Sequence, residues 1–164
     1  MNLSPRILLD DCTRSTTAAR LKLDNTPPMA ARELAGEAAH LILERIWDKF
    51  GDLHITSGYR SPDVNKAVGG SLSSDHQWTG ANCAFDFQPV EDVKLEDIYN
   101  WIRLESDIPF DQCFLERGKA LDSEKDDCIH IGYRKVGNRR RAGRKPTGGG
   151  GQIIWDTVAT VEAT

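Results

Sequence analysis

The sequence predicts an α+β fold, with a small antiparallel sheet flanked by helices, in a single domain of 164 residues. Two segments, 29–50 and 95–104, place apolar residues at helical spacing. Short apolar segments of strand length lie at 53–57, 83–87, 113–116, 128–133 and 152–158. Their order along the chain favours an antiparallel sheet with helices on one side.

The first third of the chain is predicted to be helical. Residues 3–11 predict a short helix with Ser4 as its cap, and residues 15–23 predict a second. Pro27 and Pro28 then break the chain. The strongest helix spans 29–50, and its predicted buried stripe consists of Leu34, Ala38, Leu41, Ile42, Ile46 and Phe50.

The middle of the chain alternates strands with turns. A strand at 53–57 is followed by a turn at 58–62, a helical turn at 63–68 and a loop at 71–81. The strand at 83–87 is apolar except for Asp86.

The last third begins with the helix at 95–104. Strands at 113–116 and 128–133 are predicted to form an antiparallel pair that folds back near Asp122, which places Glu116 roughly opposite His130. The basic run 134–145 and the glycines at 148–151 predict a mobile loop. The single predicted domain has a core of about residues 3–141, and residues 142–164 add the rest of this loop and the last strand.

Composition and charge exclude several classes of protein. Hydrophobic residues make up 39% and charged residues 28%, as in ordinary globular domains, and the net charge of −4 does not indicate a nucleic-acid binder. The seven basic residues of 134–145 favour a solvated loop, with attraction to anionic cell wall or nucleic acid as the alternative. No apolar run approaches the ~20 residues of a membrane span, and the N-terminus does not resemble a signal peptide.

The four cysteines predict reduced and mostly buried thiols. Cys12, Cys83, Cys113 and Cys128 lack the C-x-x-C spacing of a cysteine-ligated zinc site.

Three residues stand out as candidates for chemistry. Asp86 and His130 each lie inside an apolar strand, where a charge is costly unless it is paired or binds a metal. His76 lies in a polar loop. From the residues alone, a salt-bridged aspartate and hydrogen-bonded core histidines remain the alternative to a metal site.

Several short motifs resemble the zinc D-alanyl-D-alanine carboxypeptidase family, which includes phage endolysin peptidases and has a hedgehog-like fold. The motifs are residues 55–62, Asn65, residues 68–70, Ser74 with His76, and residues 84–87, 110–112 and 129–133. Residues 24–27 and 138–140 resemble the phage-type branch. The likeness covers roughly residues 3–141, in the expected order.

This resemblance implies a Zn²⁺ ion held by His76, Asp86 and His130, with one position open for water. Such a metal lowers the pKa of the water toward ~7. Arg60 matches the arginine that stabilises the substrate carbonyl or carboxylate, and Ser74 and Gln112 are further candidates for substrate binding.

Two points of the resemblance stay open. His76 and Asp86 are ten positions apart, which is longer than the usual family spacing, although a loop accommodates extra residues at small entropic cost. The acid that takes the proton from water is either Glu116, as in the phage-type branch, or Asp127, three residues before His130. Residues three apart on a strand face opposite sides, which favours Glu116.

The predicted function is therefore a zinc peptidase that hydrolyses peptidoglycan stem peptides, as a D-Ala-D-Ala carboxypeptidase or an L-Ala-D-Glu endopeptidase. A phage origin predicts release from the host cytoplasm by lysis, or association with virion or tail proteins. One alternative is a non-catalytic structural or wall-binding module that retains the fold. A weaker alternative is a nucleic-acid-associated protein that acts through the region of Arg139.

Overall fold

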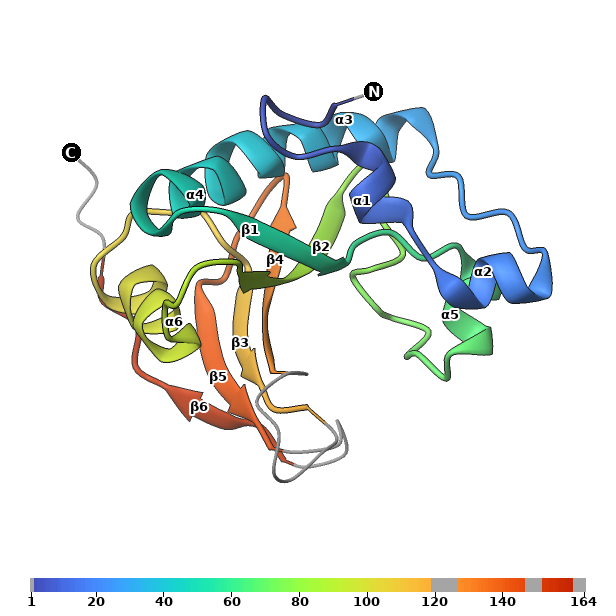
Figure 1. Cartoon of the computed structure of the whole chain (residues 1–164). Helices are drawn as coiled ribbons and strands as arrows, with labels where there is room; N and C mark the ends of the chain where they lie inside the picture. The colour runs from blue at the N-terminus through green and yellow to red at the C-terminus, as the bar shows by residue number, and fades with distance from the viewer. Residues whose placement is uncertain (1, 119–126, 147–151, 161–164) are drawn as a thin grey trace.

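The computed structural model describes residues 2–118, 127–146 and 152–160, and it confirms the α+β fold (Figure 1). The helices are α1 (Leu9–Thr13), α2 (Thr16–Leu21), α3 (Met29–Ala38), the π-helical turn η1 (Ala39–Leu43), α4 (Glu44–Phe50), α5 (Pro62–Ala67) and α6 (Leu95–Leu104). The strands are β1 (Leu53–Ser57), β2 (Asn82–Pro89), β3 (Gln112–Glu116), β4 (Cys128–Arg134), β5 (Arg141–Lys145) and β6 (Ile154–Asp156).

The long helix predicted at 29–50 is continuous but contains a π turn. α3, η1 and α4 follow one another without a break, and η1 adds a wider turn in the middle. The wider turn shifts the phase of the buried face. Leu43 is therefore fully buried, whereas Leu41, which the predicted stripe placed inside, is 39% exposed.

The N-terminal segment corrects a second prediction, because helix α1 begins at Leu9 rather than at residue 3. The carboxylate of Glu44 accepts hydrogen bonds from the Ser4 hydroxyl and from the backbone N–H of Arg6. These bonds hold the segment before α1 in a non-helical loop against α4. Ser15, by contrast, caps α2 by accepting a hydrogen bond from the N–H of Ala18.

The six strands form one sheet in the order β1-β2-β4-β3-β5-β6. Every neighbouring pair is antiparallel except β3 and β5, which run parallel. The predicted loop at 134–145 is wrong over Arg141–Lys145, since this segment forms β5. The glycines predicted to extend that loop, at 148–151, lie outside the described residues.

One face of the sheet packs against helices and forms the core. Large side chains from this face are fully buried, among them Phe85, Phe87, Ile129 and Ile131. Helix α3 packs on β2, and α6 packs on β3 through Ile98 and Ile102 (Figure 1). The side chains at alternate positions of the same strands project from the opposite face of the sheet, away from these helices, where a functional site can form.

The register of β3 and β4 corrects the predicted position of Glu116. Glu116 pairs with Cys128, and Phe114 is the residue directly opposite His130. The predicted fold-back near Asp122 lies outside the described residues, and the partner of Glu116 differs from the prediction by two residues. Because side chains two apart share a face, Glu116 still lies on the same face as His130.

The buried carboxylate of Asp111 explains why the basic run does not remain a loop. Asp111 is 1% exposed and accepts hydrogen bonds from the side chains of Arg134 and Arg139. The backbone N–H of Arg139 also donates to it, at 3.0 Å. The carboxylate of Asp111 therefore compensates the positive charges of Arg134 and Arg139, which lie just before β5, and holds β5 beside β3.

Asp111→Asn is expected to lower the free energy of unfolding by about 2 kcal/mol at neutral pH, because the guanidinium groups of Arg134 and Arg139 lose the carboxylate that both bind. Burial acts to raise the pKa of Asp111, but the hydrogen bonds from Arg139 and Arg134 outweigh it, so the pKa lies below its ordinary value. The stabilisation is thus present above the unfolded pKa near ~3.9 and is lost as the pH falls through the lower folded value. Urea unfolding of parent and variant, repeated at decreasing pH, measures both effects.

The matched control for this prediction is Asp107→Asn. Asp107 is an exposed partner of Arg45, so its replacement is expected to change stability by less than about 0.5 kcal/mol. Equal losses for the two variants would contradict the role assigned to Asp111.

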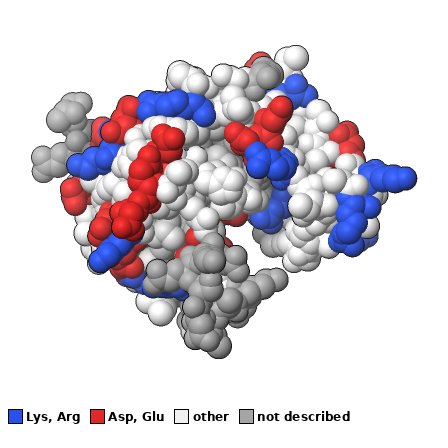
Figure 2. Space-filling model, in the orientation of Figure 1, with Lys and Arg blue, Asp and Glu red and all other residues white. Residues whose placement is uncertain are grey.

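The remaining global predictions concern cysteines, membranes and charge. All four cysteines are free thiols, and three are buried, as predicted. Among the described residues, no helix is both long and apolar enough to cross a bilayer. Figure 2 shows acidic and basic side chains interspersed over the viewed face, which does not resemble the continuous basic surface of a nucleic-acid binder.

Candidate metal centre

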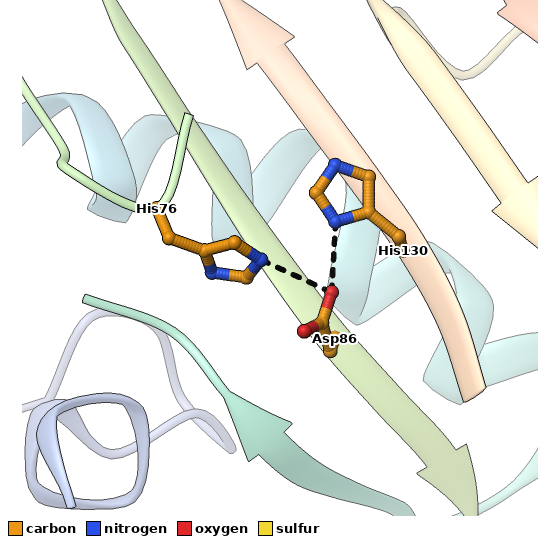
Figure 3. A group of neighbouring side chains, drawn as sticks. All are labelled: His76, Asp86 and His130. Carbon is orange, nitrogen blue, oxygen red and sulfur yellow. Dashed lines mark hydrogen bonds and ion pairs between the residues drawn. The ribbon is translucent and has the colours of Figure 1, made fainter. Parts of the chain in front are cut away.

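Three polar side chains converge on the face of the sheet that faces away from the long helix (Figure 3). His76 Nε2 lies 3.2 Å from Asp86 Oδ1, and His130 Nδ1 lies 2.8 Å from the same oxygen. One potential ligand atom from each residue falls within 4.8 Å of the other two. Ligand atoms around a tetrahedral zinc are roughly 3.3 Å apart, so the donor set has the size of a zinc site.

Strand pairing places two of the three donors. Asp86 on β2 is the cross-strand partner of His130 on β4, so their side chains leave the sheet side by side. Both residues are less than 10% exposed, as is His76. Within residues 2–118, 127–146 and 152–160, this is the one group of histidine, cysteine and acidic residues close enough to share an ion.

A backbone carbonyl fixes the orientation of His76. His76 Nδ1 lies 2.7 Å from the oxygen of Gly58, and a carbonyl only accepts, so Nδ1 carries the proton and Nε2 presents its lone pair to the centre. Gly58 is required here, because a Cβ at this position would lie 2.4 Å from the carbonyl oxygen of Cys12. The glycine thus lets the turn approach α1 closely.

The electrostatics of the centre keep Asp86 ionised. Burial acts to raise the pKa of its carboxyl, but the neighbouring imidazoles of His76 and His130 outweigh burial and hold the pKa far below its usual range. A buried carboxylate between two imidazoles is the donor chemistry that a divalent cation requires.

A compact turn absorbs the long spacing between His76 and Asp86. The side chain of Thr79 donates to Asn82 Oδ1, and the backbone N–H of Thr79 donates to the oxygen of Asn82. Trp78 is 3% exposed, packs against Tyr59 and Phe85, and donates from Nε1 to a β2 carbonyl. The additional residues therefore fold into the wall beside the centre and leave the donors together.

Arg60 extends the centre toward β1. Its Nη2 lies 3.7 Å from Asp86 Oδ2, and both Nε and Nη2 donate to the hydroxyl of Ser57. The backbone N–H of Arg60 donates to the oxygen of His76. The guanidinium thus lies at the rim of the centre, with its side chain 26% exposed.

The two candidate acids lie in different surroundings. Glu116 pairs with Cys128, two residue pairs along the sheet from His130 and on the same face, and it contacts Lys145. Asp127 is 4% exposed and accepts hydrogen bonds from the Arg117 side chain and the N–H of Gly118. Asp127 lines a cleft with Gln88, Val93 and Leu115.

The two candidate substrate-binding residues flank the donors. The hydroxyl of Ser74 accepts a hydrogen bond from the N–H of His76, and Ser74 lines a groove beside Trp78. Gln112 pairs with Gly132, two positions along β4 from His130, on the same face. The structure therefore brings both residues to the neighbourhood of the centre.

Sequence reasoning missed three contributors to this face. Phe114 stacks on the His130 ring at 5.7 Å, Lys145 contacts Glu116, and Ser57 positions Arg60. The alternation of β3 carried a signal for Phe114, because it lies two residues before Glu116. Lys145 gave no such signal, since the segment that contains it was predicted to be a loop.

A family model described as Peptidase M15 matches residues 5–118, which is more than half of the chain. The match includes His76, Asp86, Arg60 and Glu116, and it ends before β4, the strand that supplies His130. No curated protein matches the chain.

Proposed function

Because the chain belongs to the peptidase M15 family, we propose that it is a zinc-dependent peptidase that hydrolyses peptidoglycan stem peptides. The family is one of metal-dependent peptidases, which supports the reaction class. The motifs shared with cell-wall carboxypeptidases and endolysins support the substrate class, at a D-Ala-D-Ala or an L-Ala-D-Glu bond.

The observation that carries this proposal is the meeting of three donors from distant parts of the chain. His130 lies outside the matched residues, yet its Nδ1 lies 2.8 Å from the Asp86 oxygen that also neighbours His76. Two imidazoles and one carboxylate suit a zinc ion that keeps a position for water. His76, Asp86 and His130 would hold the ion, which supplies a polarised water and a Lewis acid to the substrate carbonyl.

The surrounding side chains supply charge and proton transfer. Arg60 lies at the rim of the centre, held by Ser57, and would donate to the oxygen of the substrate carbonyl or to its terminal carboxylate. Glu116 would accept the proton of the attacking water and pass it to the leaving amine. Lys145 contacts this carboxylate and fixes its position.

The setting we propose is a phage-encoded enzyme, freed from the host cytoplasm by lysis or carried on the virion with tail proteins. The motifs at 24–27 and 138–140, which resemble the phage-type branch, support it. The alternative of a non-catalytic module was motivated by the long His76–Asp86 spacing. The turn around Thr79 and Asn82 accommodates that spacing without separating the donors, so the spacing is no argument against a metal site.

The test is hydrolysis of isolated murein by the purified protein with zinc. We expect new amino termini and soluble peptides, loss of both after treatment with a chelator, and recovery when zinc is restored. Mass analysis of the products identifies the bond that is cut. Zinc bound at one ion per chain without any released peptide would instead support the non-catalytic module.

A further inference from the structure

A single row of paired residues crosses the sheet from the metal centre to the far edge. Asp86, His130, Phe114, Gly143 and Trp155 are successive cross-strand partners on β2, β4, β3, β5 and β6. Directly paired residues project from the same face of a sheet. The row therefore continues the face that carries the metal donors.

Aromatic rings occupy this row beyond the donors. The Phe114 ring lies 5.7 Å from the His130 ring, nearly parallel to it, and 5.8 Å from the indole of Trp155. Phe114 is 3% exposed, whereas Trp155 is 50% exposed. Two steps of this size span roughly three residues of extended chain, so Trp155 is within reach of a peptide bound at the metal centre.

Gly143 allows Trp155 to approach Phe114. A Cβ on Gly143 would lie 2.8 Å from the Ile153 side chain and 2.8 Å from the backbone oxygen of Ile154. The backbone oxygen cannot move away without displacing β6. The absence of a side chain at this position in the row therefore lets β6 lie close and lets the indole reach across β5.

A cation accompanies the exposed indole. The guanidinium carbon of Arg141 lies 4.6 Å from the centre of the Trp155 ring, and Arg141 is exposed. Nearby basic residues have acidic partners: Arg139 pairs with Asp111, and Arg144 pairs with Glu96 and Asp156. Among the described residues, no ion pair involves Arg141. A guanidinium stacked on an indole still directs its N–H groups outward, in a fork that fits a carboxylate.

We propose that Arg141 and Trp155 form a substrate subsite that binds a carboxylate-bearing residue of the peptide. This inference rests on the proposed peptidase function. Arg141 pairs with a free carboxylate of the stem peptide, and Trp155 packs against the aliphatic part of the same residue. The bound peptide then extends from the metal centre over Phe114, across the strands.

The test compares a stem pentapeptide with analogues in which one free carboxyl at a time is amidated. For the parent protein, amidation of the recognised carboxyl is expected to raise KM by about 10-fold and to leave kcat unchanged. Arg141→Gln is expected to raise KM for the unmodified peptide by the same factor and to become insensitive to the amidation. Trp155→Leu should raise KM for both forms equally, with zinc content unchanged in each variant.

Arg45→Gln is the matched control, because Arg45 lies on α4 at the helical side and pairs with an exposed Asp107. Its kinetics should equal those of the parent. The subsite is disproved if the parent does not distinguish any amidated analogue, or if Arg141→Gln retains the discrimination. It is also disproved if Trp155→Leu affects only substrates that carry the glycan, since that result would indicate a sugar platform.

Equilibrium binding separates this inference from the proposed activity. If the parent cleaves no murein peptide, the pentapeptide is titrated into the zinc-loaded protein instead. Binding that weakens by about 10-fold in Arg141→Gln would support the subsite without any hydrolysis, and absence of binding to the parent would overturn it.

Discussion

His130→Ala is expected to release the zinc ion and to lower kcat/KM for murein peptides by at least ~10³-fold. The variant leaves two donors, Asp86 and His76, and opens the side of the centre that faces Phe114. A catalytic zinc site with only two protein ligands does not hold its ion firmly. Metal content after gel filtration and kcat/KM on soluble stem peptides measure the two losses.

The control is His40→Ala, because His40 is exposed on η1 and lies away from the sheet. This variant should retain both zinc and activity. His130→Gln tests whether packing alone is responsible, since glutamine fills similar space. If either His130 variant kept full zinc content and full activity, the proposed centre would be wrong.

Glu116→Gln is expected to lower kcat by ~10²–10⁴-fold while zinc content and KM remain close to those of the parent. The amide keeps the size of the side chain but cannot accept the proton of the attacking water. The reason to choose Glu116 is that it lies on the same face of the sheet as His130, two residue pairs along β3 and β4. Steady-state kinetics on a soluble peptide, with metal analysis of the same samples, measure the effect.

Asp127→Asn is the comparison that decides between the two acids. The buried carboxylate of Asp127 is already occupied by hydrogen bonds from Arg117 and Gly118, so its replacement should lower stability and change kcat by less than ~10-fold. The opposite ranking, with a large loss of kcat for Asp127→Asn and a small one for Glu116→Gln, would assign the proton transfer to Asp127.

Elements that depend on local pattern were predictable from the sequence. The helix Leu95–Leu104 and the strand Leu53–Ser57 have the predicted bounds, because apolar spacing and turn residues define them locally. Two of the three donors stood out for a similar reason, whereas His76, in a polar loop, was indicated by the family resemblance alone. Asp86 and His130 are polar residues inside apolar strands, and such positions need a partner.

Features that depend on distant partners were not predictable. Ser4 bonds to Glu44, forty positions away, and this contact replaces the predicted first helix. Arg139 bonds to Asp111, so a run of like charges becomes part of a sheet. Nothing in the neighbouring sequence indicates either pairing, because the compensating charge comes from another part of the chain.

The shift of the buried face along the long helix also depends on contacts with residues distant in the sequence. A regular period of 3.6 residues places Leu41 inside, but the wider turn η1 brings Leu43 inward instead. Apolar residues occupy both positions, so the sequence fits either phase. Packing against the sheet selects one.

The strand order separates β2 and β4, which carry the metal donors, from β5 and β6 at the edge of the sheet. Substitutions in the two pairs of strands can therefore accumulate independently. β2 and β4 carry the donors Asp86 and His130, whereas β5 and β6 are attached at the other side of β3, beyond the residues that match the family. Changes in this outer pair leave the donor strands untouched. Grafting of β5 and β6 between relatives, with Lys145 retained because it contacts Glu116, is therefore a route to altering substrate choice while conserving the chemistry.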